Sequence, residues 1–310
     1  MAVECVVKNA AKSCGEGPHW DDATNALLYV DAVEKSIHRY QPGTKTDEDF
    51  YTEDIVTFVV PARRGGFIAA VGCCLVHLDW DTKKVIKLQE SDQKLQFNDG
   101  KCDPQGRVWA GTVGPIASDL ENMPRIGSLY RLDLDGSLHA MARDIGISNG
   151  LAWSSDEKFM FHIDSIPRKV YRYDFDTSTG NISNQRVAVD MEGKSVEDYG
   201  YPDGMTIDAE DKLWVACLFA GRVARYDPET GQRLQSIDIP SVLRVTSCCF
   251  GGKGLDELYV TTSAYGTDEA ISSEEFEKYP LSGSLFRVTG LGVKGRNAHI
   301  YEGKVDYLKM

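Results

Sequence analysis

Short runs of alternating apolar and polar residues recur along the whole chain. In one pattern an apolar stretch carries Arg or His and is often followed by an Asp turn. Six copies of it occur, at residues 37–40, 75–79, 129–133, 170–174, 223–227 and 285–288. Alternation of this kind is typical of a half-exposed β-strand leading into a turn. No segment shows a sustained 3.6-residue apolar period with helix caps, so the pattern predicts strands rather than helices.

A second pattern precedes each copy of the first. It begins with a residue that we call the anchor, usually with glycine soon after, an apolar or proline residue four positions later and an apolar pair near positions ten to twelve. The six anchors are Glu16, Thr57, Asn98, Asn149, Asp203 and Thr246, spaced by 41 to 54 residues. Repeats of about 40 to 50 residues with several strands each are typical of β-propeller blades.

The repeats predict an all-β fold, namely a six-bladed β-propeller with four-stranded blades around a central channel. We expect residues 1–310 to form this propeller as a single domain. The strand predicted at residues 3–7 would pair with the last blade, which closes the ring and removes an exposed sheet edge.

Equivalent positions of the repeats lie at one level of a propeller, and anchors at strand entrances near the axis converge on the channel. Four anchors carry oxygen donors: Glu16, Asn98, Asn149 and Asp203. Two carboxylates and two amide carbonyls suit calcium, magnesium or manganese, and zinc less well because no His or Cys is among them. We therefore expect one divalent metal ion as the cofactor, with calcium first among these candidates. Four protein ligands leave positions for water or substrate, as catalysis requires.

The same residues permit a second interpretation. Asn-Gly and Asp-Gly are common turn dipeptides, in which the side chain caps the local backbone. Spacing alone does not separate a metal site from a set of turns.

Several segments around the anchors carry a family resemblance. They are Gly15-Glu16-Gly17-Pro18-His19-Trp20, Phe97-Asn98-Asp99-Gly100-Lys101, Ser148-Asn149-Gly150-Leu151-Ala152-Trp153, Pro202-Asp203-Gly204-Met205, Leu213-Trp214-Val215-Ala216, and residues 246–252 and 288–295. Together they resemble the family of senescence marker protein (regucalcin), gluconolactonase and luciferin-regenerating enzyme. The resemblance implies a six-bladed propeller with one divalent ion on Glu16, Asn98, Asn149 and Asp203, and hydrolysis of a lactone or a related cyclic ester. It also implies that Asp203 acts as the catalytic general base on a metal-polarised water.

Two departures from the sugar-lactone members of the family bear on the substrate. Gln96 stands two residues before Asn98, where those members commonly carry Arg, and residues 110–112 lead into Pro115 and Ile116, where they carry Glu. Gln keeps some hydrogen-bonding ability, whereas the Pro and Ile side chains keep none. The sequence therefore favours a flatter, more apolar substrate, as in the luciferin-regenerating branch, with sugar-lactone hydrolysis as the alternative.

The remaining substrate-binding candidates neighbour the proposed ligands. His19 lies three residues from Glu16 and is expected either to line the site or to pack against the first turn. Asp99 follows Asn98 and is expected to orient it or to meet the substrate. With Gln96 and Ile116, these residues complete the predicted substrate-binding set.

The eight cysteines include two adjacent pairs, Cys73-Cys74 and Cys248-Cys249, and no Cys-x-x-Cys motif. This spacing is typical of neither a zinc site nor a redox site. Neighbours in a strand point to opposite faces, so we expect the members of each pair to have different surroundings, as buried free thiols.

The composition adds expectations about partners and location. A formal net charge of −13 disfavours nucleic-acid binding, because phosphates require clustered Lys and Arg. No segment suits a bilayer span, and the first eight residues lack the basic start and apolar run of a secretory signal. We expect a small-molecule substrate, no nucleic-acid or membrane partner, and a cytoplasmic location.

Two other functions compete with hydrolysis: a calcium-binding regulatory protein without physiological turnover, and an interaction platform. The chain has no Asp-x-Asp-x-Asp-Gly loop of a calcium sensor. An interaction platform needs no charged ring at its axis. The sequence therefore favours a metal-dependent hydrolase.

Overall fold

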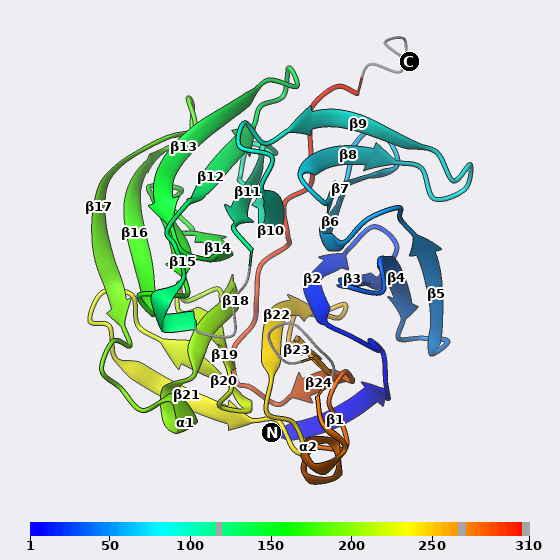
Figure 1. Cartoon of the computed structure of the whole chain (residues 1–310), viewed down its shortest axis with the longest axis vertical. Helices are drawn as coiled ribbons and strands as arrows, with labels where there is room; N and C mark the ends of the chain where they lie inside the picture. Colours follow the sequence, from blue (N-terminus) through cyan, green and yellow to red (C-terminus); the bar gives the residue numbers. More distant parts are fainter. Residues whose placement is uncertain (116–119, 266–270, 306–310) are drawn as a thin grey trace.

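The chain folds into a ring of six small antiparallel sheets around a central axis (Figure 1). The computed structural model describes residues 1–115, 120–265 and 271–305. Within these residues each sheet has four strands. The structure is thus the six-bladed β-propeller that the repeats predict.

The first five blades are each one continuous stretch of chain. Blade one comprises β2 (Gly15–Asp21), β3 (Ala26–Asp31), β4 (Ser36–Gln41) and β5 (Thr46–Tyr51), and blade two comprises β6 (Val56–Pro61), β7 (Phe67–Val71), β8 (Cys74–Leu78) and β9 (Val85–Glu90). Blade three comprises β10 (Gln96–Cys102), β11 (Val108–Val113), β12 (Gly127–Leu132) and β13 (Leu138–Ile145), and blade four comprises β14 (Ser148–Trp153), β15 (Phe159–Asp164), β16 (Lys169–Asp176) and β17 (Asn181–Asp190). Blade five comprises β18 (Tyr201–Ile207), β19 (Leu213–Leu218), β20 (Arg222–Tyr226) and β21 (Arg233–Asp238).

The sixth blade combines the two ends of the chain. It comprises β22 (Val245–Gly251), β23 (Glu257–Thr262) and β24 (Leu285–Thr289), with β1 (Ala2–Val7) as its outer strand. β1 pairs antiparallel with β24, from Ala2 opposite Thr289 to Val7 opposite Leu285. The predicted closure by the N-terminal strand is confirmed, and it satisfies the backbone edge that β24 would otherwise expose.

The recurring Asp, Trp and Arg positions of the repeat meet in buried polar clusters. Asp208 lies in the turn after β18, and its Oδ2 accepts hydrogen bonds from Trp214 Nε1 at 2.9 Å and Arg225 Nε at 2.7 Å. In blade three, Asp103 Oδ2 accepts from Trp109 Nε1 at 2.9 Å in the same way. In blade five these bonds tie the inner turn to the second and third strands, and in blade three the bond of Asp103 ties the inner turn to the second strand.

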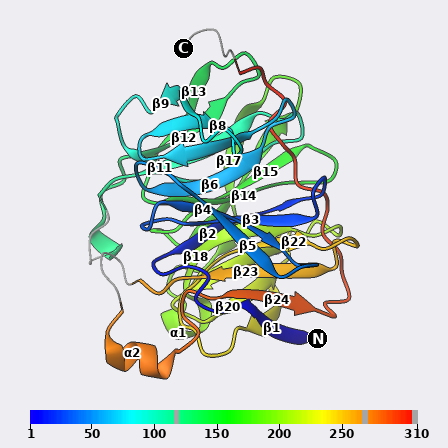
Figure 2. The same cartoon turned by 90° about the vertical axis from the view of Figure 1, so that its right-hand side faces the viewer.

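The two ends of the channel differ. Residues 291–305 run across one end of the ring, where the backbone of Tyr301 bonds to that of Pro61 and the backbone of Glu302 bonds to that of Gly106 (Figures 1 and 2). The short helices η1 (Leu120–Asn122) and α2 (Ser273–Lys278) lie at the other end (Figure 2), while α1 (Val196–Tyr199) precedes β18. None of the helices in the described part of the chain is long and apolar enough to cross a bilayer.

Candidate functional site

Every anchor lies at the second or third position of the innermost strand of its blade. Glu16, Asn98, Asn149 and Asp203 lie in β2, β10, β14 and β18, and Thr57 and Thr246 lie in β6 and β22. These six strands pack against one another around the axis. The anchors therefore converge on one end of the channel, the end opposite residues 291–305.

The Asn-Gly and Asp-Gly dipeptides are parts of strands rather than turns. Asn149-Gly150 lies inside β14, and Asp203-Gly204 lies inside β18. A Cβ on Gly150 would clash with Met205, and one on Gly204 would come within 2.7 Å of the Cα of Ser247 in the next blade. Glycine is needed here because neighbouring inner strands approach closely. This placement removes the turn interpretation for both dipeptides.

The pairing of each inner strand is interrupted just after its anchor. In blade one the register shifts between Glu16 and His19, and in blade four it shifts between Ser148 and Leu151. The other four blades show the same irregularity. Such bulges redirect side chains and are common beside active sites. Here they accompany the turning of six anchors toward the axis.

A cavity of about 580 Å³ opens at this end of the channel. All four predicted metal ligands line it, and so do Gln96 and Asp99 from the predicted substrate-binding set. The structure thus brings together six of the eight predicted site residues.

Hydrogen bonds orient the two amide ligands. Asn98 Nδ2 donates to the carbonyl oxygen of Ser148 at 2.9 Å and to Asn149 Oδ1 at 3.1 Å. Asn149 Nδ2 donates to Ser165 Oγ at 2.9 Å, and Ser165 Oγ donates to the carbonyl oxygen of Pro202 at 2.6 Å. Both NH₂ groups are thus engaged by the protein, which leaves the oxygen of Asn98 and the second lone pair of the Asn149 oxygen, already an acceptor from Asn98, to bind a cation. Ser148 of the next blade therefore orients the amide of Asn98, and Ser165 of the same blade orients that of Asn149.

Three carboxylates share the cavity at close quarters. Asp203 is 7% exposed and Asp99 is 9% exposed. Burial, followed by repulsion from Asp99, raises the pKa of Asp203 well above its usual value. Burial and the charges of Asp203 and Asp99 likewise raise the pKa of Glu16. Burial also raises the pKa of Asp99, although Lys101 opposes this effect.

This donor set fits a divalent cation. Like charges buried together are costly, and a bound cation removes that cost. The oxygens of Glu16, Asn98, Asn149 and Asp203 are hard ligands of the kind that calcium and magnesium prefer. Asp99 adds a third negative charge beside this set.

A second ring of residues lies two positions before the anchors, and all of its members line the cavity: Cys14, Ile55, Gln96, Ile147, Tyr201 and Arg244. Of these six residues, only Gln96 is among the substrate-binding residues predicted from the sequence. The repeat predicts this ring, because residues two apart in a strand lie on the same face, and the residue two positions before an anchor should therefore face the channel as the anchor does.

Arg244 is the charged member of that ring. Its guanidinium pairs with Glu275 of α2 and lies 5.3 Å from the ring of Phe219. Arginine is missing at Gln96, where sugar-lactone members of the family commonly carry it, but blade six supplies one at the equivalent level.

Two predicted residues are not placed with the others. His19 lies three residues further along β2 than Glu16, about 10 Å at the usual rise per strand residue. It lines a separate cavity of about 240 Å³ with Arg296 and His299, and burial lowers its pKa to about 3. Of its two expected roles, the packing role fits this position. Ile116 lies outside the described residues.

Comparisons with known proteins show the family of the chain. Residues 14–264 match the model of the SMP-30/Gluconolactonase/LRE-like region. Regucalcin of Danio rerio is 42% identical over 305 residues, which cover 98% of this chain and 99% of that protein. Regucalcin of Homo sapiens is 40% identical over 306 residues, with the same coverage.

Solved structures show the same fold. The structure of a luciferin-regenerating enzyme superposes with a TM-score of 0.87 and 37% identity, covering 97% of this chain and 99% of that one. A structure described as a calcium-binding protein, regucalcin, from Agrobacterium tumefaciens matches with a TM-score of 0.86 at 24% identity, covering 97% of both chains. The family resemblance noted in the sequence is thereby confirmed. The chain belongs to the SMP-30/gluconolactonase/LRE-like family.

Proposed function

We propose that this protein is a divalent-metal-dependent hydrolase that opens the ring of a small lactone. The observation that carries the proposal is the convergence of Glu16, Asn98, Asn149 and Asp203 at one end of the channel. The raised pKa values of Glu16 and Asp203, caused by burial and mutual repulsion, support a cation between them. Calcium is the first candidate by ligand chemistry, and magnesium, manganese and zinc are alternatives.

The residues divide the work of hydrolysis between them. A bound divalent cation would polarise the lactone carbonyl and lower the pKa of a water molecule. An Asp203 carboxylate oxygen takes a proton from the attacking water as its oxygen bonds to the carbonyl carbon. The ring C–O bond then breaks, the ring oxygen takes up the proton held by Asp203 and leaves as a hydroxyl, and the product is the hydroxy acid. Asp99, buried beside Asp203, orients the water or a substrate hydroxyl.

The cavity wall supports a lactone with polar substituents. Gln96, Ser165 and Arg244 supply hydrogen-bonding groups to the cavity. Membership of the family and 42% identity to a regucalcin favour this sugar-lactone alternative over the luciferin-regenerating branch. Sugar-lactone members of the family commonly carry Arg at the position of Gln96. Arg244 of blade six supplies an arginine to the same cavity from another position.

Oxyluciferin-type hydrolysis is the second candidate. The observation that favours it is the apolar part of the wall, where Ile55, Ile147, Tyr201 and Phe219 face the cavity. The structural match to a luciferin-regenerating enzyme at 37% identity supports it as well. A flat aromatic substrate would use these side chains rather than Arg244.

Turnover after metal removal tests both candidates. The protein is stripped with a chelator, resupplied with calcium, magnesium, manganese or zinc, and assayed on gluconolactone and oxyluciferin. We expect metal-restored hydrolysis that Asp203→Ala abolishes, with gluconolactone the better substrate. Metal binding without turnover of either compound would favour a regulatory calcium-binding protein.

Metal affinity tests the ligand set separately. Asn149→Ala removes one oxygen ligand, and we expect it to weaken metal binding at least tenfold in a competition titration. An unchanged affinity would show that the ion does not bind at the anchors.

A further inference from the structure

The adjacent cysteines Cys73 and Cys74 do not point to opposite faces, contrary to the expectation from sequence. Cys73 lies in the two-residue turn between β7 and β8, after Gly72 with its positive φ of 56°, and only Cys74 belongs to a strand. Alternation between faces holds inside strands, and it ends at the turn. The two Sγ atoms consequently lie 3.9 Å apart. The second pair, Cys248 and Cys249, is inside β22 and packs into two different clusters, as expected.

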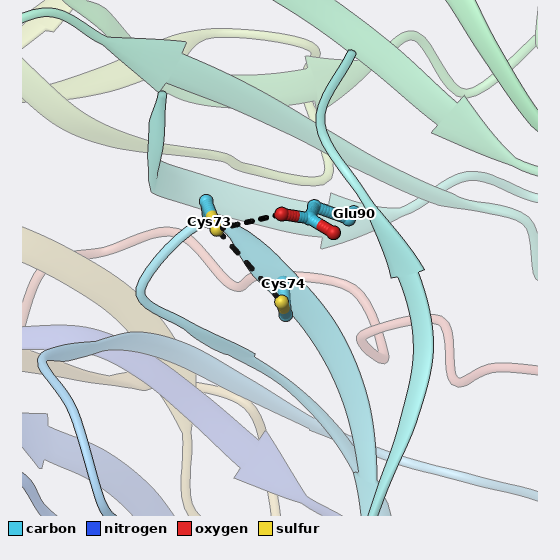
Figure 3. A group of neighbouring side chains, drawn as sticks. All are labelled: Cys73, Cys74 and Glu90. Atoms are coloured by element: carbon cyan, nitrogen blue, oxygen red, sulfur yellow. Dashed lines mark hydrogen bonds between the residues drawn. The ribbon is translucent and has the colours of Figure 1, made fainter. Parts of the chain in front are cut away.

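A carboxylate completes this cluster. Glu90 at the end of β9 is the cross-strand partner of Cys74. Its Oε1 lies 3.6 Å from Cys73 Sγ, and its Oε2 accepts a hydrogen bond from Lys87 Nζ at 2.5 Å. Figure 3 shows the two thiols and the carboxylate turned toward one another. All their ligand atoms lie within 4.8 Å of one another.

We propose that Cys73, Cys74 and Glu90 form a second metal site, which binds a thiophilic divalent cation such as zinc. It is distinct from the central site, because its ligands come from β8, β9 and a hairpin turn of blade two and not from the inner strands. Two of its three ligands are sulfur atoms, whereas the ligands predicted for the central site are all oxygens. Thiolates select zinc or cadmium, and the oxygens of the central site select hard cations.

The distances match those of a tetrahedral ion. Two thiolates at about 2.3 Å from one zinc ion lie about 3.8 Å apart. A thiolate and a carboxylate oxygen at about 2.1 Å from the ion lie about 3.6 Å apart. The observed separations are 3.9 Å between the sulfurs and 3.6 Å between Cys73 Sγ and Glu90 Oε1. Two of the three separations therefore match a tetrahedral ion, and the third, between Cys74 Sγ and the Glu90 carboxylate, is within 4.8 Å and would close on binding.

The backbone around the cluster is held in place. Ser91 N donates to the carbonyl oxygen of Cys73 at 3.0 Å, and Phe97 N donates to that of Gly72 at 2.9 Å. Cys73, Cys74 and Glu90 are each half-buried, so an ion has access from solvent and water can take the fourth position. Binding releases the two thiol protons to solvent, as for other thiolate sites.

Cadmium titration of the full-length, reduced protein tests the site. Cadmium–thiolate bonds absorb in the ultraviolet, whereas cadmium bound to oxygen ligands does not produce this band. The titration is run with calcium in excess, so that hard-cation sites are filled. We expect a band that saturates at one equivalent, disappears in Cys73→Ser and in Cys74→Ser, and forms with roughly tenfold weaker affinity in Glu90→Gln.

Controls separate this cluster from other thiols. Cys5→Ser removes another half-buried thiol, in β1, and should leave the band unchanged. Asn149→Ala, at the central site, should also leave it unchanged. Alkylation of the wild-type protein with and without zinc, followed by peptide mass mapping, requires no variant: zinc should protect Cys73 and Cys74 together. Absence of a saturable band, its persistence in Cys73→Ser, or no protection by zinc would overturn the proposal.

Discussion

Replacing Asp203 by Asn should make the metal-free protein more stable and the metal-loaded protein less so. Burial and Asp99 raise the pKa of Asp203 in the folded protein. The folded state therefore retains a proton that the unfolded chain loses above a pH of about 3.9. The contribution of Asp203 to the stability of the metal-free protein therefore falls as the pH rises from about 4 toward the raised pKa, because the unfolded state is favoured by proton release.

The size of the effect has an upper bound. At pH 7, keeping one carboxyl protonated against an unfolded pKa of about 3.9 costs at most about 4 kcal/mol. Asn has nearly the same shape and carries no charge, so Asp203→Asn should recover about 1 to 4 kcal/mol. For a chain of 310 residues this raises the melting temperature by about 2 to 6 °C.

Thermal unfolding with and without metal measures both halves of this prediction. In chelator at pH 7, Asp203→Asn should melt above the wild type, and the difference should shrink toward pH 4.5. With calcium at a hundredfold excess over its Kd, the wild type should gain about 2.7 kcal/mol. Asp203→Asn should gain much less, because it has lost a charged ligand.

Two results would refute the reasoning. One is a metal-free Asp203→Asn protein no more stable than the wild type at pH 7. The other is a stability difference between metal-free Asp203→Asn and metal-free wild type that does not grow between pH 4.5 and pH 7. Either result would mean that the carboxylates in the cavity do not repel one another.

Three further substitutions separate substrate binding from stability. Arg244→Met should lower kcat/KM for gluconolactone about tenfold with metal affinity unchanged, in steady-state assays and metal titration. Gly204→Ala should cost about 2 to 4 kcal/mol in urea unfolding, because its Cβ meets the backbone of Ser247. The matched control Gly43→Ala, with open space around it, should change stability little. Asp103→Ala should cost about 3 to 5 kcal/mol by the same assay, because a buried guanidinium loses its partner.

A different result for any of these substitutions would contradict the structural reason given for it. Unchanged kcat/KM in Arg244→Met would show that the substrate does not reach blade six. Equal effects of Gly204→Ala and Gly43→Ala would mean that the inner strands are not tightly packed. A mild Asp103→Ala would remove the structural reason for the repeated Asp and Trp positions.

The sequence alone determined the fold and the convergence of the anchors. Four-stranded repeats of this length bury their apolar faces by stacking blade on blade, and in a closed ring equivalent residues meet at one level around the axis. That logic located Glu16, Asn98, Asn149 and Asp203. The same logic implies the second ring, two positions before the anchors, which contains Tyr201 and Arg244. Of that ring, only Gln96 was predicted to bind the substrate.

Only the tertiary structure decided what depends on direction within a strand and on contact between blades. His19 is close to Glu16 in sequence, yet the chain between them, with Gly17 at a positive φ of 53° and a shift of strand register, places the two side chains in different cavities. The orientation of the two amides depends on Ser148 and Ser165, which belong to blade four. No local pattern predicts these bonds, because one joins two blades and the other spans 16 residues within blade four.

The cysteine pairs show the same division. Their sequences look alike, but Cys248-Cys249 is inside a strand and Cys73-Cys74 straddles the end of a turn. The position of the turn decides whether two adjacent thiols point to opposite faces or lie close together. The register between β8 and β9 places Glu90 opposite Cys74. The repeat therefore determined which residues reach the axis, and packing between strands and blades decided which side chains can act together.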